Sequence, residues 1–122
     1  MYRATIPMRL PGLNEFIEAC KIQRGKWNKG NQMKKDVQNE IAYYLMSLPI
    51  FDRPIRIKFI WVSTKSDRRD LDNISFAKKF ILDAMQQAGR LKNDDRKHVI
   101  GHLDDFEIGA NYEVRLEIEV KE

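Results

Sequence analysis

The segment DRRDLDN, residues 67–73, places three aspartates and two arginines directly after an apolar run. Asp70 and Asp72 are two residues apart, and in an extended backbone such residues point to the same side. Both carboxylates can then address one cation, while Leu71 between them points back to the core. Oxygen ligands of this kind suit Mg²⁺ or Mn²⁺. The spacing therefore predicts a divalent-metal site at the end of a strand.

A purely structural role would explain the same residues. Asp72 or Asn73 could cap the helix that follows, because their side-chain oxygens accept hydrogen bonds from the free N–H groups of its first turn. Asp70 could pair with Arg68 or Arg69 on the surface, where an ion pair contributes little stability. If the site is instead a metal site, the same two arginines are suited to clamp neighbouring phosphates.

A third metal ligand is expected from the second acidic cluster, NDD at 93–95, which contains Asp94 and Asp95. Between the two clusters lies an apolar stretch with helical spacing, from Ile74 to Ala88, and Gly89 is its expected stop. The connection after Gly89 could return the chain toward the first cluster.

A basic segment precedes these clusters in the chain. No acid interrupts it until Asp36, and two glycines indicate that its middle is a loop. Lysine and arginine release counterions from a nucleic-acid backbone, and an indole ring can stack on bases. We therefore expect a DNA-binding surface formed by Lys21, Arg24, Lys26, Trp27, Lys29, Lys34 and Lys35. The alternative is a solvated loop with one anchoring aromatic residue.

The elements that must position these residues follow from hydrophobic periodicity. Alternating apolar residues predict strands at 2–6, 55–63 and 111–120, and a short strand near 98–103. Three- and four-residue steps predict helices at 13–22, 33–48 and 74–88. This order predicts an α/β (α+β) fold in one domain, residues 1–122, with a single mixed sheet of about four strands and helices packed against it.

Composition narrows the class of protein. The chain is 43% hydrophobic and 33% charged, which is typical of a globular protein, and no apolar run approaches the ~20 residues that span a bilayer. Its single cysteine and the lack of a secretory signal favour a cytoplasmic location. Residues 1–61 hold 11 Lys/Arg and 5 Asp/Glu, whereas residues 62–122 hold 11 and 13. A basic half beside an acidic half suits a protein that binds a polyanion and cations.

The stretch DRRDLDNISFAKKFILDAMQQAGRLKNDDRK resembles the signature of the RusA family of Holliday junction resolvases, the endonucleases that cut four-way DNA junctions. Weaker similarity extends to LPGLNEF and to the closing strand YEVRLEIEV. The Asp-Leu-Asp-Asn core, a helix ending in Ala-Gly and an aspartate soon after it carry the resemblance. Family members are often encoded by phages.

The resemblance implies that Asp70 and Asp72 bind a divalent metal ion, Mg²⁺ with Mn²⁺ as the alternative, and that Asp94 or Asp95 completes the site. It favours Asp94, which follows an asparagine. It also implies a functional lysine on the helix after the core. In the family pattern this lysine lies three residues past the asparagine, a position that Phe76 occupies here. The resemblance therefore assigns the role to Lys79, three residues further on, with Lys78 as the second choice.

The expected function is that of a Mg²⁺-dependent, structure-selective endonuclease, a homodimer that resolves four-way junctions by paired symmetric nicks. Two cuts require two sites, and a twofold dimer supplies them. One rival is a non-catalytic module that binds branched DNA, in which the acids only cap and pair. The other is a protein-interaction domain with a solvated charged edge.

Overall fold

The computed structural model describes residues 1–122. Its main sheet has the strand order β1-β6-β4-β5, and the strands are β1 (Tyr2–Ile6), β4 (Ile55–Ser63), β5 (Val99–Ile108) and β6 (Glu113–Val120). Strands β1 and β4 pair antiparallel with β6, whereas β5 pairs parallel with β4. A mixed four-stranded sheet with helices against it confirms the predicted fold class.

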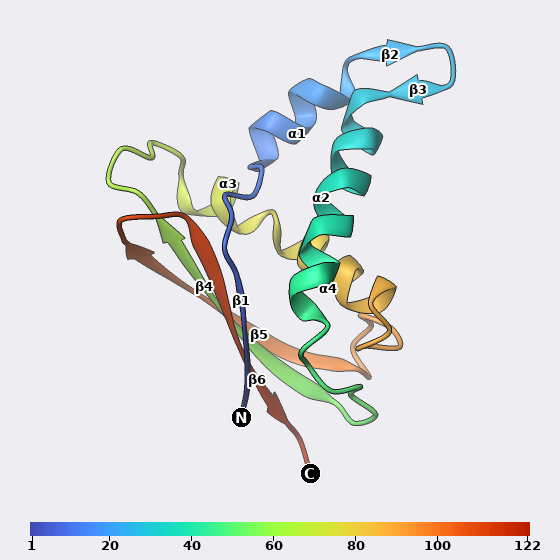
Figure 1. The fold of residues 1–122 in the computed structure, drawn as a ribbon, viewed down its shortest axis with the longest axis vertical. Coiled ribbons are helices and arrows are strands. Elements are labelled where there is room, and N and C mark those ends of the chain that lie inside the picture. The colour runs from blue at the N-terminus through green and yellow to red at the C-terminus, as the bar shows by residue number, and fades with distance from the viewer.

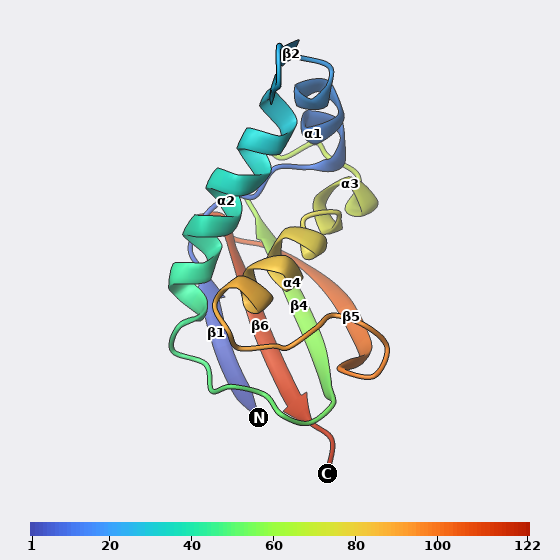
Figure 2. The ribbon, with the colours of Figure 1, turned by 90° about the vertical axis from the view of Figure 1, so that its right-hand side faces the viewer.

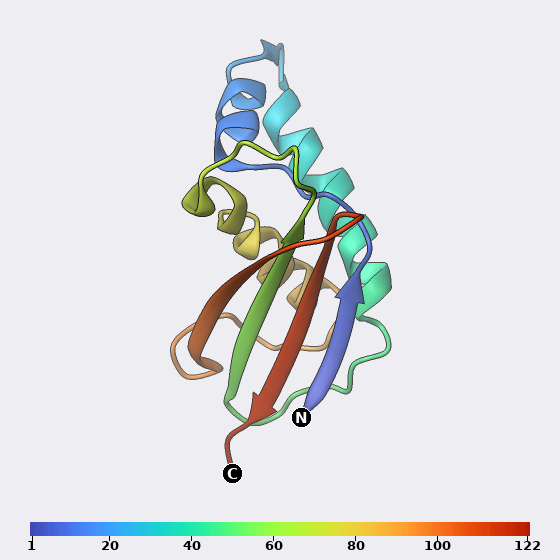
Figure 3. The same ribbon diagram turned by 90° about the vertical axis from the view of Figure 1, so that its left-hand side faces the viewer.

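The two longest helices lie across one face of this sheet, and the two shorter ones lie at or beyond its end (Figure 2); the opposite face carries no helix (Figure 3). They are α1 (Leu13–Cys20), α2 (Lys29–Leu45), α3 (Leu71–Ser75) and α4 (Lys78–Gln87). A two-stranded hairpin, β2 (Gln23–Arg24) and β3 (Trp27–Asn28), joins α1 to α2. It projects beyond the helices at the end of the molecule opposite to both termini (Figure 1).

The core lies between the sheet and the helices because the strands alternate. Ile57, Phe59 and Trp61 of β4 point toward the helices and are buried, together with Leu116 and Ile118 of the neighbouring β6. Helix α4 covers them with an apolar face made of Phe80, Ile81, Ala84 and Met85. Burial of these side chains supplies the main favourable term for folding.

Two helix predictions need correction. The continuous helix expected from Ile74 to Ala88 is divided into α3 and α4, with Phe76 and Ala77 in the break. The ring of Phe76 lies partly buried in this break and packs against Phe16 and Phe80, with centroids 5.5 Å away in each case. The expected stop at Gly89 is confirmed, and its φ of 70° is the left-handed geometry that glycine favours.

The second correction concerns the segment between α1 and α2. The expected loop is the β2–β3 hairpin, and α2 begins at Lys29 instead of Met33. Asn28 caps this helix, because its side-chain oxygen accepts a hydrogen bond from the Asn31 N–H at 3.1 Å. Strand β5, at ten residues, is also longer than predicted. None of the helices has the length and apolar character needed to cross a membrane.

Candidate active site

Asp70 and Asp72 lie at the start of α3, where the chain leaves the upper end of β4. Asp70 is the helix N-cap, has extended backbone angles, and makes no capping hydrogen bond with its side chain. Asp72 lies in the first turn, and its Oδ1 accepts a hydrogen bond from the Asn73 N–H at 3.0 Å. Both aspartates are exposed, and neither forms an ion pair with a cation of the chain.

This geometry corrects the backbone assumed above. The extended conformation ends at Asp70, and Leu71 already belongs to the helix. Leu71 is 57% exposed and does not point back to the core. The structural alternatives also fail in part, because Asp70 does not pair with Arg68 or Arg69 and forms no cap bond.

Hydrogen bonds join the turn that carries Asp70 and Asp72 to the start of α1 and the segment before it. The Asn14 N–H donates a hydrogen bond to Asn73 Oδ1 at 3.1 Å. The Asn73 side chain thus accepts from the first turn of α1 and not from that of α3. Gly12 lies so close that a Cβ there would be 2.5 Å from the same oxygen. Asn73 therefore fixes α3 against α1 across 59 residues of sequence.

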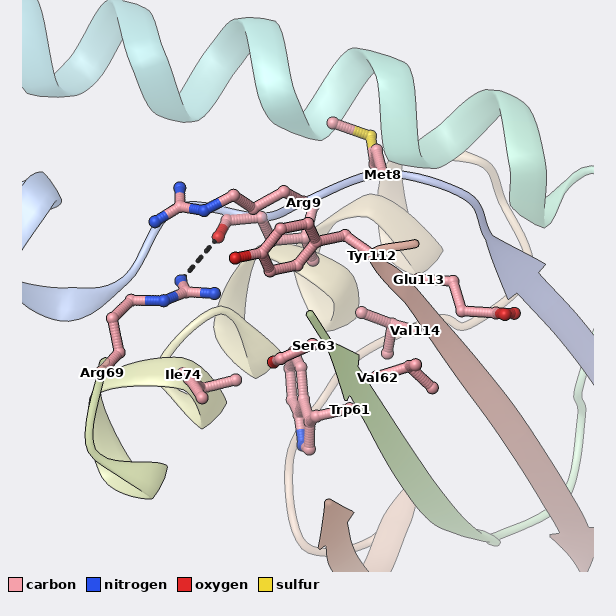
Figure 4. Close-up of a pocket in the computed structure, with 11 residues that line it drawn as sticks. Met8, Arg9, Trp61, Val62, Ser63, Arg69, Ile74, Tyr112, Glu113 and Val114 are labelled. Atoms are coloured by element: carbon pink, nitrogen blue, oxygen red, sulfur yellow. Dashed lines mark hydrogen bonds between the residues drawn. The ribbon is translucent and has the colours of Figure 1, made fainter. Parts of the chain in front are cut away.

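Arg69 makes the second attachment. Its guanidinium pairs with Asp67 at 2.7 Å and donates a hydrogen bond to the Leu10 carbonyl oxygen at 3.0 Å. The side chains of Arg69 and Asp67 are only 12% and 6% exposed. Figure 4 shows Arg69 beside Arg9 and the ring of Tyr112, in a pocket of only about 10 Å³. This pocket holds at most one water molecule, so it is not a substrate site.

The two arginines of the segment therefore differ in role. Arg69 is bound within the protein, so its guanidinium is not free to clamp a phosphate as predicted. Arg68 is exposed and has no ion-pair partner, which leaves it available to an anion. Sequence reasoning missed the positioning role of Arg69, although the spacing Asp67-Arg-Arg69 is the available signal for such a local pair.

The Asp67–Arg69 pair makes a prediction about acid stability. The hydrogen bond from Arg69 lowers the pKa of Asp67 to about 2, from a usual value of 3.8. A lowered pKa means that the stabilisation is complete above about pH 5 and is lost as the pH falls toward 2. The expected loss is about 2 kcal/mol. Urea unfolding at pH 6 and pH 2 should measure it.

Asp67→Asn is the control for that experiment, since the amide does not titrate. The free energy of unfolding of the variant should fall less than that of the wild type on acidification, by about 2 kcal/mol. Other carboxylates titrate in both proteins and cancel in the comparison. An equal pH dependence in the two proteins would contradict the pair's contribution.

Asp94 and Lys79 are in direct contact with each other. Lys79 Nζ donates to Asp94 Oδ2 at 2.7 Å and also pairs with Asp83 at 3.0 Å. These hydrogen bonds, first from Asp94 and then from Asp83, raise the pKa of Lys79 above its usual value. Asp83 in turn pairs with Lys34 of α2 at 2.9 Å. The predicted helper lysine and the preferred third ligand thus neutralise one another.

Asp95 and Lys78 have partners of their own. Asp95 Oδ1 lies 2.6 Å from His98 Nδ1, and this hydrogen bond lowers the pKa of Asp95. Lys78 Nζ pairs with Asp104 Oδ2 at 2.6 Å on strand β5, and lies 3.3 Å from His102 Nδ1. The two lysines therefore project toward different partners, and both lie on α4, beyond the break that separates it from the helix of Asp72 and Asn73.

The donors at 70 and 72 match a hard divalent cation in chemistry, because both are carboxylates that no internal cation neutralises. A third protein ligand does not lie beside them. No group of three or more His, Cys, Asp or Glu side chains is close enough together to hold one ion. The completion of the metal site by Asp94 or Asp95 stays a prediction.

The basic residues of the segment fall into two groups, those with an ion-pair partner and those without. Lys21 pairs with Glu18 at 2.8 Å, and Lys34 pairs with Asp83. The remaining basic residues of the segment form no ion pair and are exposed; they are Arg24, Lys26, Lys29 and Lys35.

Comparison with known proteins adds no relative. No protein-family model matches the chain, and no curated protein is significantly similar to it. The RusA resemblance therefore rests on the Asp-Leu-Asp-Asn core, the Ala-Gly helix end and the aspartate after it.

Proposed function

We propose that this protein is a metal-dependent, structure-selective endonuclease that nicks branched DNA, with the four-way junction as its substrate. The observation that supports this proposal most is the pair Asp70 and Asp72. They are exposed at the start of a helix, held by a fastened turn, and left without an internal cation. Asp67 is paired with Arg69, whereas Asp70 makes no side-chain hydrogen bond and Asp72 accepts only the neighbouring Asn73 N–H, so the charge of both stays available to a cation.

The reaction is hydrolysis of a phosphodiester bond. A divalent ion, Mg²⁺ or Mn²⁺, would be held by Asp70 and Asp72, and it supplies an activated water and charge neutralisation at the scissile phosphate. Hydrolysis by this route leaves 5′-phosphate and 3′-hydroxyl ends. The resemblance adds Asp94 or Asp95 as a further ligand.

The chain's own residues contribute binding and orientation. Arg68 is free to form charge-assisted hydrogen bonds with a phosphate next to the cut. Arg69 positions the turn through Asp67 and the Leu10 carbonyl. Lys79 is the preferred source of a positive charge near the transition state, and it must exchange its contact with Asp94 to act in that way. Lys78 is the alternative.

A homodimer is part of this proposal. A four-way junction is resolved by two symmetric cuts, and one chain of 122 residues offers one Asp70–Asp72 pair. A twofold dimer presents two such pairs with the symmetry of the junction.

A second candidate function is a module that binds branched DNA without cutting it. It is favoured by the lack of a convergent group of three metal ligands. It is also favoured by the internal pairing of both Lys78 and Lys79. In this case the acids at 70 and 72 would limit binding rather than support catalysis.

One gel experiment separates these functions. The purified protein is incubated with synthetic four-way, forked and duplex DNA, with Mg²⁺ or with EDTA. The nuclease should nick the four-way junction only with Mg²⁺, and bind it in EDTA. A binding module would shift the junction under both conditions without a nicked product, and that outcome would refute the nuclease.

A further inference from the structure

The β2–β3 hairpin presents a cation and an aromatic ring on one face. Arg24 lies directly opposite Trp27, and Gln23 lies opposite Asn28. Directly opposed residues of an antiparallel pair share a face, and neighbours along a strand alternate. The hairpin therefore has one face with Arg24 and Trp27, and another with Gln23 and Asn28.

The second of these faces anchors the hairpin. Asn28 Nδ2 donates to the Cys20 carbonyl oxygen at 2.9 Å and to Gln23 Oε1 at 2.8 Å. The Lys29 N–H donates to the Ile22 carbonyl oxygen at 3.0 Å, which closes the base of the hairpin. The hairpin is therefore held at its base by bonds to the end of α1.

The first face makes no aromatic, cation–π or ion-pair contact within the chain. Trp27 is 41% exposed and packs against no other aromatic ring, and no cation of the chain lies over it. Arg24, and Lys26 at the tip, are both exposed and form no ion pair. The turn itself is tight, with Gly25 at a φ of 58° and no atom near the place of its missing Cβ. A large indole that is 41% exposed and has no stacking partner, on an anchored hairpin, indicates a contact surface.

We propose that the β2–β3 hairpin is a binding site for unpaired nucleobases, with Trp27 as the stacking platform and Arg24 and Lys26 as contacts to the flanking phosphates. This inference rests on the proposed action on branched DNA, where bases at the branch point are open to stacking. Aromatic rings stack on any base, and basic residues beside them follow the backbone. The hairpin thus selects single-stranded or branched regions over uniform duplex.

Two tryptophans make a direct test possible. Trp61 is 2% exposed and its Nε1–H donates to Asp104 at 2.8 Å, so it is a shielded background. A change in tryptophan fluorescence on ligand addition then reports on Trp27. The titration is done in EDTA, which prevents metal-dependent cleavage, with oligo(dT), a duplex of equal length, and heparin as a polyanion without bases.

Oligo(dT) should quench the emission strongly, whereas heparin and duplex should bind through charge with little quenching. Trp27→Ala and Trp27→Phe lack the reporter indole, so their affinities are measured by gel shift of labelled oligo(dT) beside the wild type. Trp27→Ala should weaken oligo(dT) binding about tenfold, and Trp27→Phe should largely preserve it, because a phenyl ring also stacks. Tyr43→Ala is the control, since Tyr43 is 75% exposed on α2 outside the hairpin. Far-UV circular dichroism confirms that the variants are folded.

Equal oligo(dT) affinity in Trp27→Ala and wild type would overturn the inference, and so would equal quenching by heparin. These failures differ from failure of the nuclease. If oligo(dT) quenches but junctions are never nicked, the base-binding site stands and the enzyme does not. If junctions are nicked and Trp27→Ala binds normally, the enzyme stands and the hairpin site is wrong.

Discussion

Replacement of Asp70 or Asp72 by Asn is expected to reduce nicking of a four-way junction by at least about 100-fold, because a neutral amide cannot hold a divalent ion at the scissile phosphate. Binding of the junction in EDTA should be kept or become tighter, since each change removes a negative charge from the surface proposed to face phosphates. Stability should change little, because both side chains are exposed and unpaired.

The measurement is single-turnover cleavage of a labelled junction beside a gel-shift titration of the same preparation. Asp52→Asn is the matched control, since Asp52 is also an exposed aspartate, at the far end of β4. It should cut like the wild type. Full activity in Asp70→Asn or Asp72→Asn would remove the proposed metal role, and loss of binding together with cutting would indicate a misfolded turn.

Replacement of Arg69 by Ala is expected to cost about 3 kcal/mol of unfolding free energy, because it leaves the nearly buried carboxylate of Asp67 without its cation. It also removes the hydrogen bond to the Leu10 carbonyl oxygen that ties the turn to the N-terminal segment. The melting temperature should fall by about 10 °C, and nicking should fall as well, since Asp70 loses its support.

Arg68→Ala is the control for that variant, as the neighbouring arginine is exposed and unpaired. Its stability should stay within about 0.5 kcal/mol of the wild type. Its junction affinity should fall instead, and the slope of affinity against salt should decrease by about one counterion. If the two variants lose equal stability, the division of roles between Arg68 and Arg69 is wrong.

The strands were predictable from sequence because their signal is local. The alternation in YEVRLEIEV reflects one buried and one exposed face, and IRIKFIWVS alternates at its start and is buried on both faces from Phe59 to Val62; β4 and β6 occur where these patterns indicate. The helix from 74 to 88 was predicted too long. Its apolar spacing is continuous, but the burial of Phe76 among rings from two helices depends on tertiary packing and interrupts it.

The site was predictable only in part. The positions of Asp70 and Asp72 follow from a motif of adjacent residues, and both lie exposed at the start of a helix. The partners of Asp94 and Lys78 depend on contacts between residues distant in the chain, such as Lys78 with Asp104. Nothing in the local sequence distinguishes such a pair from the alternatives.

The close approach of Gly12 to Asn73 leaves little room for a side chain at position 12. A methyl group at position 12 would meet the amide oxygen that joins α1 to α3, so the amide must move. Gly12→Ala would therefore displace the Asn73 amide, and its methyl group would lie 3.1 Å from the Asn73 carbonyl oxygen, next to Asp72 in the chain. In a mutational scan for activity, Gly12 would rank beside Asp70 and Asp72, although it contacts no substrate. The sensitivity of activity to substitution at Gly12 would come from the Asn14–Asn73 hydrogen bond between α1 and α3.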